Sequence, residues 1–322
     1  MPAPLNLPLA RTSLSREADL RRDQDLLASL RSNPDARAAV LCDGKFLAEA
    51  DLVSLRLLPL TQLLELGDFE ALTYLGQTTS DSTGLAAGTS IVLVELGAEQ
   101  AEWVTGQAIA DACTWLQLRR SGFGLSDLDS GIATQALAIS NWHASHGFCP
   151  GCGNQTAVVQ AGWVRHCDSC DKDLFPRTDP AVIAAVTDDQ DRLLLGSQGV
   201  WESNRWSVLA GFVDPGESLN AAVAREMFEE SGLRVTEIEF QGSQPWPFPF
   251  SLMMAFTAKA SGEQQLRPDG FEIERLRWIT REQLAVEAAE LRLPSKVSIS
   301  RALIEQWFGA ELISLTEIET SK

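Results

Sequence analysis

The amino-acid sequence predicts a mixed α/β (α+β) fold in which a small metal-binding module separates two domains. Apolar strand-like runs and helical patterns occur both in residues 1–145 and in the stretch after residue 176. Between these stretches, four of the six cysteines fall close together. A chain of 322 residues that is 45% hydrophobic is long enough to bury two separate cores.

The charge of the chain excludes some classes of function. A formal net charge of −18 disfavours a broad surface for nucleic acid or anionic membrane, because such binding depends on Lys and Arg contacts to phosphates. No window approaches the roughly 18 apolar residues of a membrane span, and the first residues lack a basic region followed by an apolar one. We therefore expect a cytoplasmic protein with no membrane partner.

Residues 1–145 form the first predicted domain, and no catalytic motif is found in them. Strand-like runs cover residues 38–41 and 90–96, and a helical pattern covers 131–143. Residues 76–90, rich in Gly, Ser and Thr, indicate a loop. We interpret this domain as one for packing or dimerisation.

Two Cys-x-x-Cys pairs define the second module, residues 146–175. Cys149 and Cys152 are followed by Cys167 and Cys170, a spacing that supplies four thiolates to one tetrahedral Zn²⁺. Four sulfurs close the coordination shell, so one structural zinc per chain is expected. The alternatives are free or redox-active thiols and a ribbon that binds nucleic acid. The second alternative is disfavoured because the cationic residues nearby are few, namely Arg165, His166 and Lys172.

Residues 176–310 form the third predicted domain, with residues 311–322 as a C-terminal tail. Its strand-like runs are 181–187, 192–196, 206–212, 240–242, 252–258 and 275–279, with turns at 188–191 and 214–216. One helix is expected to begin at Ser218, which is a suitable cap, and to end at Gly232. A last helix is expected over residues 295–308.

Three glutamates fall on one face of the helix that begins at Ser218. Glu226, Glu229 and Glu230 stand at positions i, i+3 and i+4, so their like charges repel one another on that face. Mg²⁺ or Mn²⁺ would relieve this repulsion, and two or more such ions could hold a pyrophosphate and activate a water molecule. The alternative is a solvated acidic face, which fits the fixed spacing of the neighbouring Gly and Arg residues poorly.

The segment Gly211 to Leu233 resembles the signature of the Nudix hydrolases, G-x5-E-x7-R-E-U-x-E-E-x-G-U, where U is apolar. The fixed positions are filled by Gly211, Glu217, Arg225, Glu226, Glu229, Glu230 and Gly232. The resemblance implies a Nudix fold, a mixed sheet between helices. It also implies that Glu226 and Glu230 are metal ligands, that Glu229 is a further ligand or the base, and that Glu217 pairs with Arg225.

A second motif follows at residues 243–251, where prolines alternate with aromatic residues. The alternation predicts a stiff, extended segment without regular strand pairing, suited to stacking on flat rings. Hydrogen bonds could come from Gln244 and Ser251. A proline-rich partner motif and plain core packing are the alternatives. The segment comprises Ser243, Gln244, Pro245, Trp246, Pro247, Phe248, Pro249, Phe250 and Ser251.

This motif resembles the SQPWPFPxS element of the NADH pyrophosphatase (NAD⁺ diphosphatase) family, which also carries a four-cysteine ribbon. Membership implies hydrolysis of NADH or NAD⁺ to nicotinamide mononucleotide and AMP, removal of NAD caps from RNA in bacterial relatives, and a homodimer with its active site near the subunit boundary. Other dinucleotides or ADP-ribose as substrate, and a non-catalytic NAD-binding regulator, are the rival interpretations.

Local matches to the same family imply further site residues. They are the Ala210 carbonyl and Glu272 as metal ligands, and Phe175, Phe212 and Ser300 as substrate contacts. Where relatives often have Glu-Ala-x-Trp, this chain has Arg-Leu-Arg-Trp at 275–278. Glu272 and Glu274 therefore remain alternatives for the ligand outside the signature.

Overall fold

The computed structural model describes residues 5–69, 71–81 and 84–316, and the chain divides into two compact units. The N-terminal unit comprises Pro8–Thr178 together with Trp246–Phe250. The C-terminal unit comprises Asp179–Pro245, the chain from Ser251 onward and the first residues up to Leu7. Five residues of the proline-rich motif thus belong to the N-terminal unit, although in sequence they lie within the third predicted domain.

The N-terminal unit contains a largely antiparallel sheet. Its order is β1 (Leu14–Ser15), β5 (Leu72–Thr78), β6 (Ser90–Glu95), β2 (Arg37–Cys42), β3 (Lys45–Glu49) and β7 (Cys113–Leu116), with β4 (Leu57–Pro59) paired to β2. The central strands β2 and β6 run parallel. Both are almost wholly buried, which accounts for their apolar sequences, Ala-Ala-Val-Leu and Ile-Val-Leu-Val.

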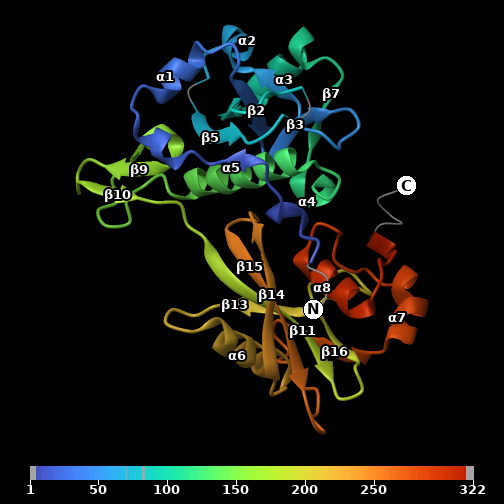
Figure 1. Cartoon of the computed structure of the whole chain (residues 1–322). Helices are drawn as coiled ribbons and strands as arrows, with labels where there is room; N and C mark the ends of the chain where they lie inside the picture. The colour runs from blue at the N-terminus through green and yellow to red at the C-terminus, as the bar shows by residue number, and fades with distance from the viewer. Residues whose placement is uncertain (1–4, 70, 82–83, 317–322) are drawn as a thin grey trace. The chain divides into compact units, whose positions relative to one another are not determined.

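Helices pack against this sheet. They are α1 (Leu26–Arg31), α2 (Leu60–Glu65), α3 (Ala98–Thr105), α4 (Leu118–Ser121) and α5 (Asp127–Ser145), and short 3₁₀ turns cover Pro8–Ala10, Ala18–Arg22, Ala108–Ala110 and Gln160–Gly162. The hydroxyl of Ser126 caps α5 by accepting from the Asp129 N–H. Ile132, Ala136 and Trp142 of α5 are fully buried, so this long helix forms part of the unit's core (Figure 1).

Most predicted elements of this unit are confirmed. Residues 38–41 lie in β2, residues 90–95 form β6, and residues 131–143 lie within α5. The predicted loop at 76–90 is wrong at both ends, because residues 76–78 belong to β5 and Ser90 begins β6. Gly76 has φ 138°, and a Cβ there would lie 2.0 Å from the Ser15 carbonyl oxygen, so this glycine permits close strand pairing and does not mark a loop. Residues 82–83 of the predicted loop lie outside the described residues.

The C-terminal unit is built on a mixed sheet. Its order is β14 (Thr236–Trp246), β15 (Ser251–Ala260), β11 (Asp179–Asp188), β12 (Leu193–Ser197) and β16 (Arg275–Ile279), and β13 (Leu209–Phe212) also pairs with β11. β11 runs parallel to β15 and antiparallel to β12 and β13. The central strand β11 is therefore hydrogen-bonded to three other strands of the sheet, β12, β13 and β15.

Alternate residues of β11 serve two separate cores. Val182, Ala184 and Val186 pack in a cluster with α6 (Leu219–Ser231), whereas Ile183 and Ala185 pack with α8 (Ile299–Phe308). Helix α7 (Arg281–Glu287) and the 3₁₀ turn Ala288–Glu290 cover the second face (Figure 1). The predicted mixed sheet between helices is confirmed.

The hairpin between β11 and β12 turns at residues 188–191, as predicted, and the Asp188 carboxylate holds it by accepting from the N–H groups of Gln190 and Arg192. The runs 240–242, 252–258 and 275–279 lie in β14, β15 and β16. The predicted strand 206–212 is too long, because only Leu209–Phe212 pairs with β11. Ser207 instead forms an isolated bridge to Gly196.

Two further expectations are corrected. The last helix begins at Ile299 and not at residue 295, because the hydroxyl of Ser298 caps it. Strand pairing extends through Trp246, so the motif is not free of regular structure. Pro245 is tolerated because β14 lies at the end of the strand order, where a missing N–H does not interrupt the sheet.

The described part of the C-terminal tail, residues 311–316, packs on α8. Leu312 is buried, and its carbonyl accepts from the guanidinium of Arg301. Residues 317–322 lie outside the described residues. Among the helices that the structure describes, none has the length and apolar character to cross a membrane.

Candidate metal and pyrophosphate site

Helix α6 carries the three glutamates between two well-defined ends. The Ser218 hydroxyl accepts from the Ala221 N–H at 3.3 Å, and Gly232 ends the helix with φ 74°, a left-handed conformation that glycine adopts without strain. Ala222, Val223 and Met227 are fully buried against the sheet. Both predicted ends of this helix are confirmed, and the apolar face fixes which way the glutamates point.

Arg225 binds the loop before the helix to the helix itself. Its guanidinium donates to both carboxylate oxygens of Glu217, at 2.9 and 2.8 Å, and to the Phe212 carbonyl at 2.9 Å. These bonds hold the pKa of the Glu217 carboxyl below its usual value and raise that of Arg225. The same guanidinium donates to Glu226 at 2.8 Å and to Glu229 at 3.0 Å.

Gly211 lies directly against the carboxylate of Glu226. A Cβ at this position would fall 1.9 Å from the carboxyl carbon of Glu226, so no side chain fits unless the glutamate moves. Strand β13 therefore passes α6 at backbone distance. Its residue Ala210 pairs with Ile183 of β11, which places the backbone of residues 210–211 beside the glutamate cluster.

Glu230 is the most deeply buried carboxylate of the cluster. Its side chain is in a residue only 4% exposed, and its Oε2 has no hydrogen-bond partner among the residues that the structure describes. Burial, and then the charges of Glu226 and Glu272, raise the pKa of Glu230 to about 8. Burial also raises the pKa of Glu226, against the opposing effect of Arg225. A divalent cation would compensate these buried charges, so the residues present fit such an ion.

Glu272 and Glu274 lie in different surroundings. Asp269 fixes the loop that carries Glu272, since its carboxylate accepts from the N–H groups of Phe271, Glu272 and Ile273. The negative charge of Glu272 raises the pKa of both Glu226 and Glu230, so its carboxylate lies near them. The carboxylate of Glu274 instead lies beside Gly199, 3.4 Å from the position of a Cβ there.

The residues predicted to contact substrate differ in accessibility. Phe212 in the C-terminal unit is 59% exposed, and Phe175 in the N-terminal unit is 66% exposed. Gln244 is fully buried and donates to the Val297 carbonyl. Ser300 is buried as well, with its N–H donated to the Ser298 hydroxyl and its own hydroxyl paired with Ser207. The two phenylalanine rings are therefore accessible to a ligand, whereas the side chains of Gln244 and Ser300 are hydrogen-bonded within the protein.

Sequence reasoning missed Asn141 and Arg119, which contact the proline-rich motif within the N-terminal unit. Asn141 donates to the Pro247 and Pro249 carbonyls, and the Arg119 guanidinium lies 5.7 Å from the Trp246 ring. A separation of 106 residues divides Asn141 from Pro247, and no local pattern in the sequence marks such a contact.

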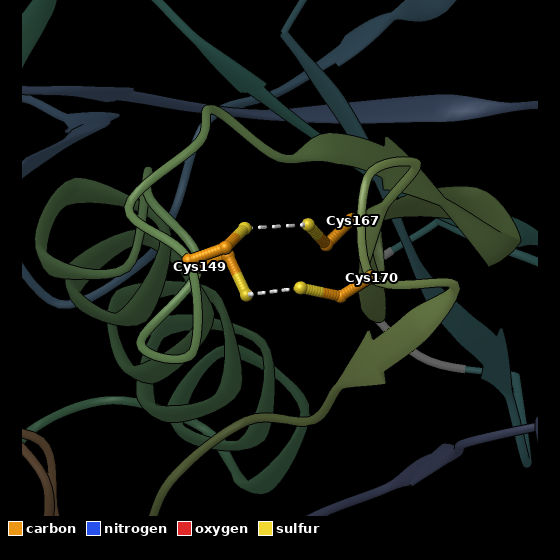
Figure 2. Close-up of side chains that lie close together, drawn as sticks. Cys149, Cys167 and Cys170 are labelled. Carbon is orange, nitrogen blue, oxygen red and sulfur yellow. Dashed lines mark hydrogen bonds between the residues drawn. The ribbon is translucent and has the colours of Figure 1, made fainter.

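The four ribbon cysteines gather at one end of a small antiparallel sheet of β10 (Lys172–Leu174), β9 (Val164–Cys167) and β8 (Ala157–Val159). The four Sγ atoms all lie within 4.8 Å of one another. Figure 2 shows the turn of Cys149 facing that of Cys167 and Cys170. The Gly151 and Cys152 N–H groups lower the pKa of the Cys149 thiol to about 7, whereas burial raises the pKa of Cys167 and the hydrogen bond with Cys152 raises that of Cys170. Four adjacent thiolates therefore need a cation such as Zn²⁺ to compensate their charge.

The zinc-ribbon module is further anchored to helix α5 through His143. His143 Nε2 lies 2.8 Å from the Gly162 carbonyl and therefore carries the proton, which leaves Nδ1 to accept from Arg165 at 3.1 Å. Arg165 also donates to the Thr156 hydroxyl and carbonyl. This network ties the ribbon strands to helix α5 without using the cysteines.

The chain matches three family models in order. Residues 177–302 match the NUDIX domain, and the glutamate helix and its sheet lie in that range. The chain therefore belongs to the Nudix superfamily. Residues 144–175 match the NADH pyrophosphatase zinc ribbon domain, and residues 35–142 match the NADH pyrophosphatase-like rudimentary NUDIX domain. Within the superfamily the chain is thus a member of the NADH pyrophosphatase family.

Similar curated proteins carry the name NAD-capped RNA hydrolase. NudC of Mycobacterium tuberculosis is 38% identical over 206 residues, which are 61% of this chain and 66% of that protein. NUDT12 of Homo sapiens is 36% identical over 197 residues, 57% of this chain and 42% of that protein. The matches span less than two thirds of these relatives. A NUDIX hydrolase structure from Nitrosomonas europaea aligns with a TM-score of 0.41 and 22% identity, over 51% of this chain and 94% of that one.

Proposed function

We propose that this protein hydrolyses the pyrophosphate of NADH or NAD⁺ and releases nicotinamide mononucleotide and AMP. The family models and the names of the relatives support this activity. The observation that carries the proposal is the buried Oε2 of Glu230 in α6, which has no hydrogen-bond partner within the described part of the chain and lies one helical turn from Glu226. Such a carboxylate is unfavourable in the protein alone and becomes favourable as a metal ligand.

The residues that would hold Mg²⁺ or Mn²⁺ are Glu226, Glu230, Glu272 and the carbonyl of Ala210. Their positions support this assignment, since β13 passes against Glu226 and the charge of Glu272 raises the pKa of both Glu226 and Glu230. Bound divalent ions would polarise the phosphoryl oxygens and lower the pKa of the attacking water.

The remaining residues of the Nudix signature orient these ligands. Arg225 sets the positions of Glu226 and Glu229 by donating to both, and its bonds to Glu217 keep the loop folded over the helix N-terminus. Glu229 is exposed, so it can meet solvent water as a base or complete a metal shell. Gly211 leaves room for the Glu226 carboxylate to lie against the strand backbone, since a Cβ at this position would collide with it.

Substrate choice depends on groups that contact the bases, because the glutamates act on any pyrophosphate. Phe212 is exposed and its carbonyl is fixed by Arg225, which suits it to stack on a base. Phe212→Ala should raise KM for NADH, by an amount corresponding to about 1–3 kcal/mol of lost stacking, and leave the metal requirement unchanged.

The decisive experiment is a product assay with NADH, NAD⁺ and ADP-ribose, each with Mg²⁺ and with Mn²⁺. The proposal expects nicotinamide mononucleotide and AMP, with a higher kcat/KM for NADH than for ADP-ribose. Equal kcat/KM for NADH and ADP-ribose would favour a broader Nudix hydrolase that does not recognise the nicotinamide. Tight NAD binding without any product would favour a regulator.

A second proposed substrate is NAD-capped RNA, on the strength of the names of both relatives. With a net charge of −18, the chain offers little attraction for an RNA body, so the cap should supply most of the affinity. We expect KM for capped oligonucleotides to change little with RNA length or salt. A steep salt dependence would instead reveal a phosphate-binding surface.

We further propose that the protein is a cytoplasmic homodimer. A reducing compartment suits four cysteines kept as metal ligands, and the family resemblance motivates the dimer. Exposed apolar residues on the ribbon module, such as Phe148 and Val158, offer material for an interface. Sedimentation at micromolar concentration tests this proposal, and a monomer across that range would contradict it.

A further inference from the structure

The loop of residues 267–273, which precedes β16, is fastened to helix α6 within the C-terminal unit. At its start, the Arg267 N–H donates at 2.8 Å to the carbonyl of Ser231, the residue that follows Glu230. At its end, Ile273 is buried in the core cluster that includes the apolar face of α6. The loop therefore begins and ends against the helix that carries the three glutamates.

Asp269 folds this loop from within. Its Oδ1 accepts from the N–H groups of Phe271 at 3.1 Å, Glu272 at 3.2 Å and Ile273 at 2.8 Å. Gly270 completes the turn, with φ 76° and its N–H donated to the Ile273 carbonyl at 3.1 Å. One carboxylate thus satisfies three successive N–H groups in a segment outside the helices and strands, and Glu272 is the middle residue of the three.

The folded loop places the charge of Glu272 near the carboxylates of α6. Burial has the largest effect on the pKa values of Glu226 and Glu230, and the charge of Glu272 raises both of them further. The charge of Asp269 also raises the pKa of Glu230. Because three backbone N–H groups already engage the Oδ1 of Asp269, we assign this residue a role through Glu272 and not as a metal ligand.

We propose that Asp269 is a positioning residue of the carboxylate metal site, which holds Glu272 beside α6 and thereby sets the affinity for a divalent cation. The inference rests on the proposed function, because it takes Glu272 as a ligand. A loop without Asp269 would lose its conformational freedom only when the metal binds, and this entropic cost would lower the affinity. Loss of Asp269 should therefore weaken metal binding and leave kcat at saturating metal almost unchanged.

Three substitutions separate the hydrogen bonds of Asp269 from its charge. Asp269→Asn keeps an acceptor oxygen in the same place without the charge, Asp269→Glu keeps the charge but moves the oxygens by one methylene, and Asp269→Ala removes both. The Kd for Mn²⁺ should stay within about threefold of wild type in Asp269→Asn, rise about fivefold in Asp269→Glu and rise about tenfold or more in Asp269→Ala.

Asp189→Ala is the matched control. The Asp189 carboxylate also holds a loop of the C-terminal unit by accepting a backbone N–H, that of Gly262 at 2.7 Å, but this loop carries none of the proposed ligands. The Kd for Mn²⁺ should therefore equal that of wild type in Asp189→Ala. Melting curves and zinc content check that each variant is folded.

Two measurements without substrate decide the inference. Electron paramagnetic resonance of free Mn²⁺, titrated into the full-length, zinc-containing protein at one fixed pH, gives the Kd. Hydrogen exchange of the Phe271, Glu272 and Ile273 amides reports the loop itself, and it should be faster in Asp269→Ala and Asp269→Glu than in wild type and Asp269→Asn.

Wild-type affinity in Asp269→Ala would overturn the inference, as would an equal loss in Asp189→Ala. A weaker affinity in Asp269→Asn than in Asp269→Glu would show that Asp269 acts through its charge and not by holding the loop, and this order decides alone if Asp269→Ala does not fold. A wild-type protein that binds Mn²⁺ but does not cleave NADH would instead overturn the proposed function, and the affinities and exchange rates would still decide whether Asp269 positions Glu272.

Discussion

The ribbon and helix α6 differ in how closely the fold brings together the side chains that could bind a metal, four thiols in the ribbon and three carboxylates on the helix. In the ribbon, the Sγ atoms of the four cysteines lie within 4.8 Å of one another. On helix α6, Arg225 donates to Glu226 and Glu229, whereas the buried Oε2 of Glu230 has no hydrogen-bond partner among the residues described. A closed thiol shell suits a metal that stabilises the fold, whereas an incomplete carboxylate shell leaves room for water and phosphate.

The largest effect is expected from Glu230→Gln. If the open carboxylate shell supplies the chemistry, loss of this charge should lower kcat by about three orders of magnitude or more, with the fold retained. Steady-state rates at saturating Mg²⁺, together with a melting curve, measure both. Glu229→Gln should also reduce turnover. Near-normal rates in both variants would show that the helix face is not the metal site.

Cys149→Ser tests the four-cysteine site of the ribbon. We expect one zinc per chain to stabilise the fold, so the substitution should lower the melting temperature and the yield of folded protein. The kcat of the folded fraction should match that of wild type. Metal analysis of protein prepared without chelators checks the stoichiometry, and finding no zinc there would contradict the ribbon assignment.

A comparison of Glu272→Gln with Glu274→Gln tests which of the two glutamates belongs to the carboxylate metal site. Because the charge of Glu272 acts on Glu226 and Glu230, its replacement should lower kcat by about 10- to 100-fold. Glu274 lies beside Gly199, so its replacement should change kcat less than about twofold. The reverse ranking would move the metal site toward Gly199.

The smallest effect concerns stability without Mg²⁺ or Mn²⁺. The folded protein raises the pKa of Glu230 from 4.5 to about 8, so the folded state retains a proton that the unfolded chain has lost. The stabilisation that accompanies this proton is present below about pH 4.5 and is lost as the pH rises to about 8. The melting temperature should fall through this window, by on the order of 5 °C more than in Glu230→Gln. Parallel profiles for the two proteins would contradict the assigned shift.

Local chemistry made much of this molecule predictable. Ser218 and Gly232 mark the ends of α6 through capping that depends on neighbouring residues, and the cysteine spacing depends on two short turns. Contacts between distant residues were not predictable. We expected Gln244 to supply a hydrogen bond to substrate, and the structure shows its side chain buried, with its amide donating to the Val297 carbonyl. Neither this burial nor the hold of Asn141 on two proline carbonyls leaves a pattern in the nearby sequence.

Because the pKa of Glu230 is raised, metal binding at this carboxylate should release a proton. Below about pH 8 the metal-free site retains the Glu230 proton, and a cation that takes this carboxylate as a ligand must displace it. Apparent metal affinity should then fall about tenfold per pH unit on the acid side of this value. The measured heat of metal binding should vary with the ionisation enthalpy of the buffer that receives the proton. The buried carboxylate would thus set how much free divalent metal is required at each pH.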